Sequence, residues 1–282
     1  MRGAAPILTP RQLPSRLLVA AALVTPGSRV ADVGCDHGLL SIHMANSGLA
    51  ERVLACDRSR ESLRGAAANI AECTAPEHEG TIDTRLGDGL MALRADDQIE
   101  ELLLCGLGVH RMMHILDGKA LSERLLSVRA LVLQPVAPRL PLLFELRKHV
   151  RRHGFCIERE FFSRDQGRDY LTLRATRVQR AGGSRPVLRP DAHPRVEHEL
   201  LLGPNSSLCA HWQDDGFADF LREQRATLTA EAAGMRRGLR RVKDETTTTK
   251  RVEVLRRHER WVAMLDEQLA QHATAAPPLI TY

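Results

Sequence analysis

Short apolar runs alternate with stretches of helical periodicity along the first part of the chain. Apolar runs of strand length lie at 29–34, 53–57, 82–86, 102–105 and 130–134. Between them, apolar positions at helical spacing predict helices at 39–47, 59–72, 109–116 and 141–153. Continuous apolar strands that alternate with helices are typical of a parallel sheet covered on both faces, so the pattern predicts an α/β fold.

Two further apolar runs, 155–162 and 170–175, follow without a helix between them. The seven residues that separate them can close a hairpin but cannot make a parallel crossover. The sheet is therefore expected to be mostly parallel, with one antiparallel strand at or near its end.

The pattern changes in the last third of the chain. Residues 178–194 are rich in Gly, Pro, Arg and Ser, which is typical of a linker. Beyond them, helices are predicted at 217–241 and 247–272, with apolar residues spaced by seven at Leu221, Leu228 and Met235 and again at Leu255, Val262 and Leu269. Two such stripes joined by a short polar turn predict an antiparallel, coiled-coil-like helical hairpin. We therefore expect a first domain at 1–177, a linker at 178–194 and a hairpin domain at 195–282.

Composition narrows the class of protein. The 282 residues carry a formal charge of +5, and the longest apolar runs, such as 17–24, are too short to cross a bilayer. The N-terminus resembles a targeting peptide in its arginines, but it lacks a small-residue cleavage site, and 12–24 reads better as an amphipathic helix. No pair among the six cysteines has CxxC spacing, so neither a metal site nor disulfides are expected. These features favour a cytoplasmic protein.

The first predicted strand ends in an unusual turn, Asp32-Val33-Gly34-Cys35-Asp36-His37-Gly38. Gly34 allows a sharp turn and a close approach to a ligand, and the next helix begins near Gly38 with its N–H groups facing that ligand. The turn lacks the third glycine of a dinucleotide-binding loop, and the carboxylate of Asp36 would repel a pyrophosphate. An acidic turn favours a ligand with cationic centres, S-adenosylmethionine, over NAD.

The ends of the second and third strands carry further acids. Asp57 lies 23 positions after Gly34, where an acid commonly binds ribose hydroxyls, although it could instead cap the following helix. Asp88, between Gly87 and Gly89, could accept a hydrogen bond from an adenine amino group, or the three residues could form an ordinary turn.

The fourth strand ends in Cys105-Gly106-Leu107-Gly108-Val109. Paired glycines let backbone approach a flat ring, although they could also serve helix-to-sheet packing. The chain has no Asn/Asp-Pro-Pro-aromatic motif at this position, which many amino-group methyltransferases carry, so an exocyclic amine is a less favoured acceptor.

Together these stretches resemble the bacterial TrmK family, the tRNA adenine-22 N1-methyltransferases. The resemblance rests on RVADVGCDHGLLSIHMA, Asp57, RLGDGL, LLLCGLGVHRMMHIL, LVLQP and ELLLGPNSSLCAHW, and it covers nearly the whole chain. It implies a Rossmann-like class I methyltransferase fold, S-adenosyl-L-methionine as cofactor, tRNA as partner and methylation of adenine N1.

The resemblance also implies roles for residues. Those expected to bind the cofactor are Asp32, Gly34, Cys35, Asp57, Arg58, Asp88, Gly89, Cys105 and Gly106. Those expected around the acceptor base are Gly108, Val109, Gln134 and Pro135. Asp36 is placed to stabilise the positive charge that methylation creates on the ring. His37 either orders Asp36 and contacts a ligand or is a helix-start residue bonded to backbone.

Two positions depart from the family pattern near the acceptor base. Val109 stands where a glycine is usual, and Val136 stands where an asparagine is usual. These departures leave open two alternatives, which are a methyltransferase for another RNA or a small molecule and a cofactor-binding RNA-interaction protein without turnover.

Clusters of basic residues are candidates for contact with RNA phosphates. They are Arg147, Lys148, Arg151, Arg152, Arg236, Arg237, Arg240 and Arg241. Each cluster could instead be a solvated helix face. The hairpin could also pair with a second copy, so the sequence leaves monomer and homodimer open.

Overall fold

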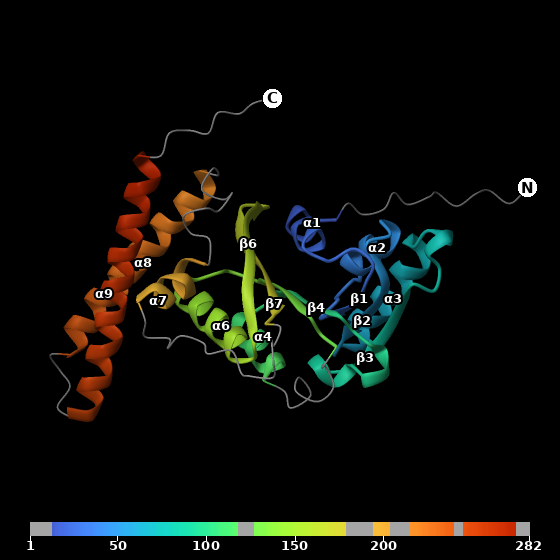
Figure 1. Ribbon diagram of the computed structural model, residues 1–282, viewed down its shortest axis with the longest axis horizontal. Coiled ribbons are helices and arrows are strands. Elements are labelled where there is room, and N and C mark those ends of the chain that lie inside the picture. Colours follow the sequence, from blue (N-terminus) through green and yellow to red (C-terminus); the bar gives the residue numbers. More distant parts are fainter. Residues whose placement is uncertain (1–12, 118–126, 179–193, 204–214, 240–244, 275–282) are drawn as a thin grey trace, which may run out of the picture. The chain divides into compact units, whose positions relative to one another are not determined.

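One seven-stranded sheet organises the N-terminal part of the chain (Figure 1). Its strands are β1 (Ser28–Val33), β2 (Ala50–Asp57), β3 (Ile82–Leu86), β4 (Glu101–Leu107), β5 (Ala130–Pro135), β6 (Phe155–Asp165) and β7 (Arg168–Arg177). They lie in the order β3-β2-β1-β4-β5-β7-β6. The first five strands pair in parallel, and β7 is antiparallel to both of its neighbours, β5 and β6. This confirms the mostly parallel sheet with one antiparallel strand near its end.

The computed structural model describes residues 13–117, 127–178, 194–203, 215–239 and 245–274. These residues divide into two units, Met1–Pro138 with Leu146–Val187 and Arg139–Glu145 with Leu188–Tyr282. Residues 139–145, at the start of a helix, group with the second unit, although they fall within the predicted first domain; the predicted boundary at 177 stays a prediction. The predicted linker, apart from its two end residues, lies outside the described part.

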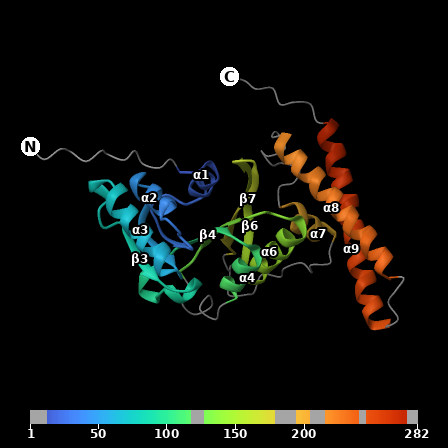
Figure 2. The ribbon, with the colours of Figure 1, turned by 180° about the vertical axis from the view of Figure 1, so that it is seen from behind.

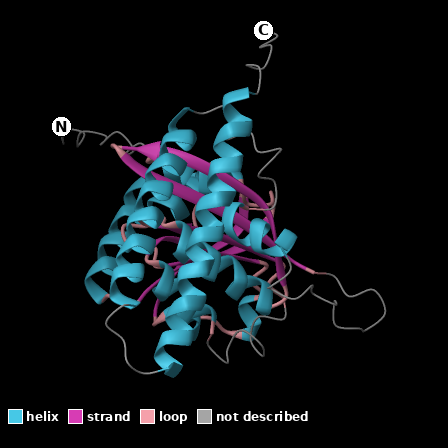
Figure 3. Ribbon diagram, turned by 90° about the vertical axis from the view of Figure 1, so that its left-hand side faces the viewer, coloured by secondary structure: helices cyan, strands magenta, loops and turns pink. Residues whose placement is uncertain are grey.

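Helices cover both faces of the sheet. The first unit has α1 (Ser15–Ala22), α2 (Leu39–Asn46), α3 (Arg60–Cys73), α4 (Val109–Leu116) and most of α6 (Leu140–Arg152), with short 3₁₀ turns at Pro76–His78, Gly89–Ala92 and Ala95–Asp97. Figure 3 distinguishes the helices, in cyan, from the strands of the sheet, in magenta. The strand order grows from β1 in both directions. Because parallel crossovers are right-handed, α2 and α3 lie on one face while α4 and α6 lie on the other.

The central strands are buried as their apolar runs predicted. Leu102, Leu103 and Leu104 of β4 are fully buried, as are Leu131 and its two successors in β5. A strand can bury successive residues only when both faces of the sheet are covered. Among the described helices, none has the length and hydropathy that a membrane span requires.

The β6–β7 hairpin is tighter than the predicted seven-residue connection. Asp165 pairs with Arg168, so only Gln166 and Gly167 form the turn. Both have positive φ, 48° and 71°. Two consecutive left-handed residues make a type I′ turn, whose twist matches that of the flanking strands, and the strands therefore extend to the turn.

The second unit contains a helical pair. Its helices are α7 (Pro194–Leu202), α8 (Asp215–Leu239) and α9 (Glu245–Thr274), and α8 and α9 run side by side in opposite directions (Figures 1 and 2). Ion pairs between Arg225 and Asp266 and between Arg236 and Glu259 fix the antiparallel register. Of the predicted stripe residues, Leu221, Leu228 and Leu255 are buried, and Met235, Val262 and Leu269 are half-buried. The structure therefore confirms the helical pair.

An aromatic residue that the heptad pattern does not reveal lies at the centre of this unit. Trp261 of α9 is 1% exposed, and its ring centroid lies 4.8 Å from that of Phe144. Its indole N–H donates a 3.1 Å hydrogen bond to Glu197 of α7. Since a buried indole N–H needs an acceptor, Glu197 satisfies the one polar atom of this side chain.

Candidate active site

A pocket lies at the point between β1 and β4 where the order of the strands reverses. Its lining comes from the carboxyl ends of four strands and from α4, and consists of Val33, Gly34, Asp57, Arg58, Gly87, Asp88, Gly89, Leu107, Arg111 and Ile115. Open α/β sheets bind ligands at such a reversal of strand order. The structure therefore brings together parts of all four motifs singled out in the sequence.

The turn after β1 is shaped by Gly34. Its φ is 84°, and a β-carbon here would meet Leu107 Cδ2 at 3.3 Å. The N–H groups of Gly34 and Cys35 both donate to the carbonyl of Cys56, at 2.8 and 3.0 Å. The turn is thus pinned to the end of β2, and the space that a side chain would fill at Gly34 stays open beside the pocket.

Asp36 occupies a left-handed backbone conformation with φ of 50°. This conformation is uncommon for residues other than glycine, although Asp and Asn tolerate it. Its N–H donates to Asp57 Oδ2 at 3.2 Å, which holds the turn in place. The Asp36 side chain is 70% exposed, so a negatively charged group stands at the edge of the sheet where ligands bind.

His37 lies next to Asp36. Its Nε2 is 3.7 Å from Asp36 Oδ2, which is longer than a hydrogen bond, and the imidazole is 55% exposed. The backbone carbonyl of His37 accepts a 2.9 Å bond from the Asn69 side chain. The hydrogen bond to Asn69 is therefore made by the His37 carbonyl and not by its ring. The imidazole is left able to move relative to Asp36.

Asp57 has a carboxylate of fixed orientation. Oδ1 accepts the N–H of Ser59 at 2.8 Å, and Oδ2 accepts the N–H of Asp36 at 3.2 Å. The alternative role as helix cap is excluded, because Ser59 is the N-cap of α3 and its hydroxyl accepts the N–H of Ser62. Each carboxylate oxygen has a second lone pair, so Asp57 can still accept hydrogen bonds from a ligand.

The turn after β3 combines tight packing with an ion pair. A β-carbon on Gly87 would lie 2.7 Å from Ala92 Cβ, and one on Gly89 would lie 3.1 Å from Ile115 Cγ1. Packing therefore requires a glycine at position 87, whereas a side chain at Gly89 would need Ile115 to shift and would be strained at its φ of 57°. The carboxylate of Asp88 forms an ion pair with Arg111 of α4. Arg111 was missed in the sequence, where the only signal was a charged residue in the first turn after the fourth strand.

Asp32 is buried and is not among the residues that line the pocket. It is 3% exposed, and the Ser41 hydroxyl donates to it at 2.7 Å. Burial raises the pKa of Asp32 to about 6; the Ser41 bond lowers it, and the charge of Asp57 raises it further. Burial likewise raises the pKa of the Cys35 and Cys105 thiols, which therefore remain protonated at neutral pH.

Asp32→Asn should change how stability depends on pH. Because the folded protein holds the Asp32 proton to higher pH than the unfolded chain, the contribution of this carboxyl falls as pH rises from its ordinary pKa of 3.8 to about 6. The stability of the variant minus that of the wild type should grow by on the order of 2–3 kcal/mol between about pH 4 and pH 7. Urea unfolding at several pH values measures this, and a difference that stays constant with pH would contradict the assignment.

The proposed acceptor residues are divided between surface and core. Gly108 is exposed as the N-cap of α4, and Gly106, which was expected to bind the cofactor, sits in a register shift of β4 with φ of 75°. Val109 is 3% exposed, so its side chain belongs to the core. Pro135 at the end of β5 is also buried, whereas Val136 is 40% exposed.

Gln134 is fully buried and held by α1. Its Oε1 accepts from the guanidinium of Arg16 at 3.0 Å, and its Nε2 donates to the Arg16 carbonyl at 2.6 Å and to Thr172 Oγ1 at 2.7 Å. The Arg16 guanidinium also stacks 5.1 Å above the Tyr170 ring. Arg16 thereby links the N-terminal helix to the strand ends, a role that sequence periodicity alone does not reveal.

The prediction that Arg147 contacts RNA is corrected by the burial of its side chain. Arg147 is 1% exposed and forms a bidentate ion pair with Glu160, so it is not available to RNA. Of its neighbours, Lys148 and Arg151 are half-buried and Arg152 is exposed. Arg236 and Arg237 are exposed on α8, with Arg236 paired to Glu259. Arg240 and Arg241 lie outside the described residues.

Comparison with known proteins identifies the family. A family model described as a methyltransferase domain matches residues 13–173, more than half of the chain. The chain belongs to this methyltransferase family. The matched region contains β1 to β6, part of β7 and every residue that lines the pocket. A search among curated proteins gave no match.

Solved structures similar to this methyltransferase extend the likeness in fold beyond the matched domain. The Bacillus subtilis m1A22 tRNA methyltransferase TrmK has a TM-score of 0.69 at 18% identity, covering 92% of this chain and 99% of that one. Mycoplasma capricolum TrmK with S-adenosyl-homocysteine has 0.63 at 18%, covering 90% and 100%. Streptococcus pneumoniae Sp1610 with S-adenosyl-L-methionine has 0.61 at 21%, covering 92% and 100%. These likenesses establish a shared fold over nearly the whole chain.

Proposed function

We propose that this protein transfers a methyl group from S-adenosyl-L-methionine to N1 of an adenine in tRNA, at a position of the adenine-22 type. The observation that carries the proposal is the pairing of Asp36 with Asp57 at the strand reversal, where the second carboxylate anchors the backbone of the first. Membership in the methyltransferase family and the names of the similar solved structures support it.

The pocket residues fit S-adenosyl-L-methionine. This cofactor supplies a methyl group on a positively charged sulfur, which an acidic turn attracts and a phosphate-binding loop would not. Asp57 would accept the ribose hydroxyls with its spare lone pairs. At Gly34, Gly87 and Gly89 the walls of the pocket are backbone without side chains. The Asp88 carboxylate would accept a hydrogen bond from the adenine amino group in place of part of its ion pair with Arg111.

Asp36 would act on the acceptor base through its charge. Adenine N1 has a free lone pair at neutral pH, so no residue has to remove a proton before attack. Methylation makes the ring cationic, and a carboxylate already held at this point stabilises that charge without reorganisation. Asp36 can also accept a hydrogen bond from the N6 amino group, and the His37 imidazole, now 3.7 Å away, would orient the carboxylate if it moved to hydrogen-bond distance.

Contact with tRNA would involve basic side chains of both units. Exposed Arg152, with half-buried Lys148 and Arg151, lies near the end of α6, and Arg237 is exposed on α8. Such residues follow phosphates without reading sequence, and the pairing edge of the target adenine must leave any stack before N1 is reached. We assign the helical hairpin at 195–282 to tRNA contact, and a tRNA substrate places the protein in the cytoplasm.

Methyl transfer to tRNA tests the proposal directly. Unmodified tRNA of the host is incubated with the full chain and methyl-labelled cofactor, and the product is mapped. We expect 1-methyladenosine at one position, and we expect it to be lost when that adenine is replaced by guanine.

Asp57→Ala should weaken cofactor binding by more than about tenfold, because the variant lacks the carboxylate that would accept hydrogen bonds from the ribose. Calorimetry with the cofactor measures this change.

Three other results would contradict the assignment in different ways. Transfer to RNA at another atom would keep the methyltransferase and change its target. Calorimetric binding of the cofactor without turnover on any host tRNA would indicate an RNA-interaction protein. Host tRNA that contains 1-methyladenosine in equal amount after removal of this protein would refute the substrate.

A further inference from the structure

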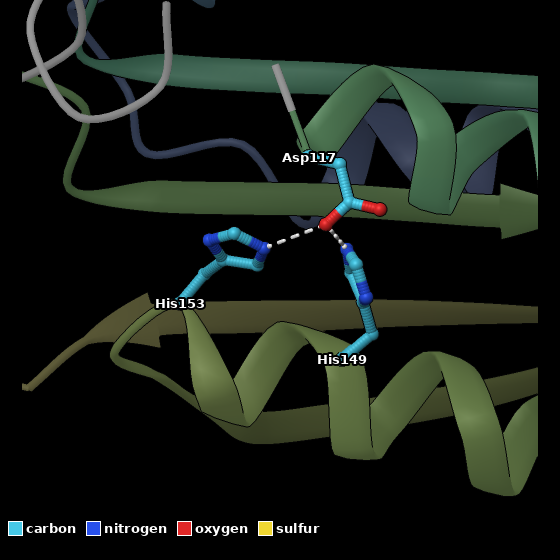
Figure 4. A group of neighbouring side chains, drawn as sticks. All are labelled: Asp117, His149 and His153. Carbon is cyan, nitrogen blue, oxygen red and sulfur yellow. Dashed lines mark ion pairs between the residues drawn. The ribbon is translucent and has the colours of Figure 1, made fainter. Parts of the chain in front are cut away.

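Three side chains of types that can bind a metal ion meet between α4 and α6 (Figure 4). Asp117 is the C-cap of α4, His149 lies in the last turn of α6, and His153 follows the end of that helix. The two histidines are spaced by four, so one helical face presents both rings, and in Figure 4 both point toward the Asp117 carboxylate. One ligand atom from each residue lies within 4.8 Å of the other two.

The distances within this cluster suit shared coordination better than hydrogen bonding. The Nε2 atoms of His149 and His153 lie 3.4 and 3.5 Å from the same oxygen, Oδ1 of Asp117. Both distances exceed the range of about 2.7–3.2 Å for a hydrogen bond. Zinc bonds of about 2.0–2.2 Å at tetrahedral angles place neighbouring ligand atoms about 3.3–3.5 Å apart.

His149 offers a buried ring nitrogen to the cluster. Its Nε2 has no hydrogen-bond partner among the described residues. This atom lies 3.4 Å from Asp117 Oδ1, so an ion held between them would give the buried nitrogen the partner that it lacks.

The backbone of Asp117 is held at the end of α4. Its N–H donates to the Met113 carbonyl at 2.8 Å. The carboxylate is therefore presented to the two histidines from a fixed position on the chain.

We propose that Asp117, His149 and His153 bind a divalent transition-metal ion of the Zn²⁺ type, with water completing its coordination. The Asp117 side chain is 62% exposed, which leaves access for the ion and for water. None of the three residues is among those that line the pocket, although Ile115, two positions before Asp117, is. The ion would tie α4 to α6.

The sequence offered one unused signal for this site. Cysteine spacing alone led to the expectation of no metal, but His149 and His153 form an H-x-x-x-H pair on a predicted helix. Asp117 is 32 positions before His149, so only the fold brings it to the pair.

Cobalt binding tests the proposal with a signal that does not depend on activity. Full-length protein without an affinity tag is treated with chelator, desalted and titrated with Co²⁺. We expect one equivalent to give visible d–d absorption, removed by added Zn²⁺. His149→Ala and His153→Ala should each weaken binding by more than about tenfold, and Zn²⁺ should raise the Tm of the wild type but not of these variants.

Two further variants keep the test decisive if His149→Ala fails to fold. Asp117→Asn changes an exposed side chain and should also weaken Co²⁺ binding, while His114→Gln, which changes an exposed histidine on α4 outside the cluster, should leave it unchanged. Absence of saturable Co²⁺ binding by the wild type would overturn the proposal. Equal binding by the wild type, His153→Ala and Asp117→Asn would overturn it as well. Methyl transfer by the metal-free protein is a separate measurement and is expected to persist.

Discussion

Asp36→Asn should lower kcat for methyl transfer by about 100- to 1,000-fold while cofactor affinity changes little. The variant removes the charge that would face the ring as it becomes cationic. It keeps the backbone N–H that binds Asp57, so the turn and the cofactor pocket stay intact. Single-turnover rates with labelled cofactor measure the chemical step, and calorimetry measures binding.

Asparagine is the informative substitution because of the backbone at this position. A φ of 50° suits Asn and Asp but strains other residues, so Asp36→Ala would mix loss of charge with distortion of the turn. Asp96→Asn, which changes an exposed aspartate outside the pocket, is the matched control and should react at the wild-type rate. A normal single-turnover rate for Asp36→Asn would show that the carboxylate has no part in catalysis.

The strand ends could be predicted because their signals are local. A buried strand shows as a run of apolar residues, and parallel strands bring their carboxyl ends to one edge. Glycines and acids at those ends therefore had to come together, and Gly34, Asp57 and Asp88 line one pocket. The sheet with its antiparallel strand and the pair of long helices followed from the same periodicities.

Other features depend on partners distant in sequence. Val109 directly follows an exposed glycine, yet its side chain is buried, and the residues at the start of α6 group with the second unit. Arg111 reaches the pocket because α4 packs against the 3₁₀ turn that follows β3, where Asp88 lies. An amphipathic pattern says that one face of a helix is buried, but a run of basic residues around that helix does not say which of them points inward.

Arg147 is the clearest example, and its replacement should cause the largest loss of stability. The Arg147 Nε donates to Glu160 Oε1 at 2.7 Å, and its Nη2 donates to Oε2 at 2.8 Å. The two side chains are 2% and 4% exposed. Arg147→Ala leaves the Glu160 carboxylate buried without this partner, so the free energy of unfolding should fall by about 3–5 kcal/mol. Urea unfolding measures this loss.

Removing both charges together distinguishes an uncompensated charge from a required ion pair. Arg147→Met combined with Glu160→Leu fills the same space with apolar atoms, and its stability should return close to that of the wild type, since the attraction of a buried pair roughly offsets its desolvation. Arg159→Ala removes an exposed arginine beside Glu160 and should change stability by less than about 0.5 kcal/mol. The double variant should also bind tRNA as the wild type does, because Arg147 is enclosed in the fold. If the double variant folds but has lost tRNA binding, Arg147 does contribute to contact with RNA.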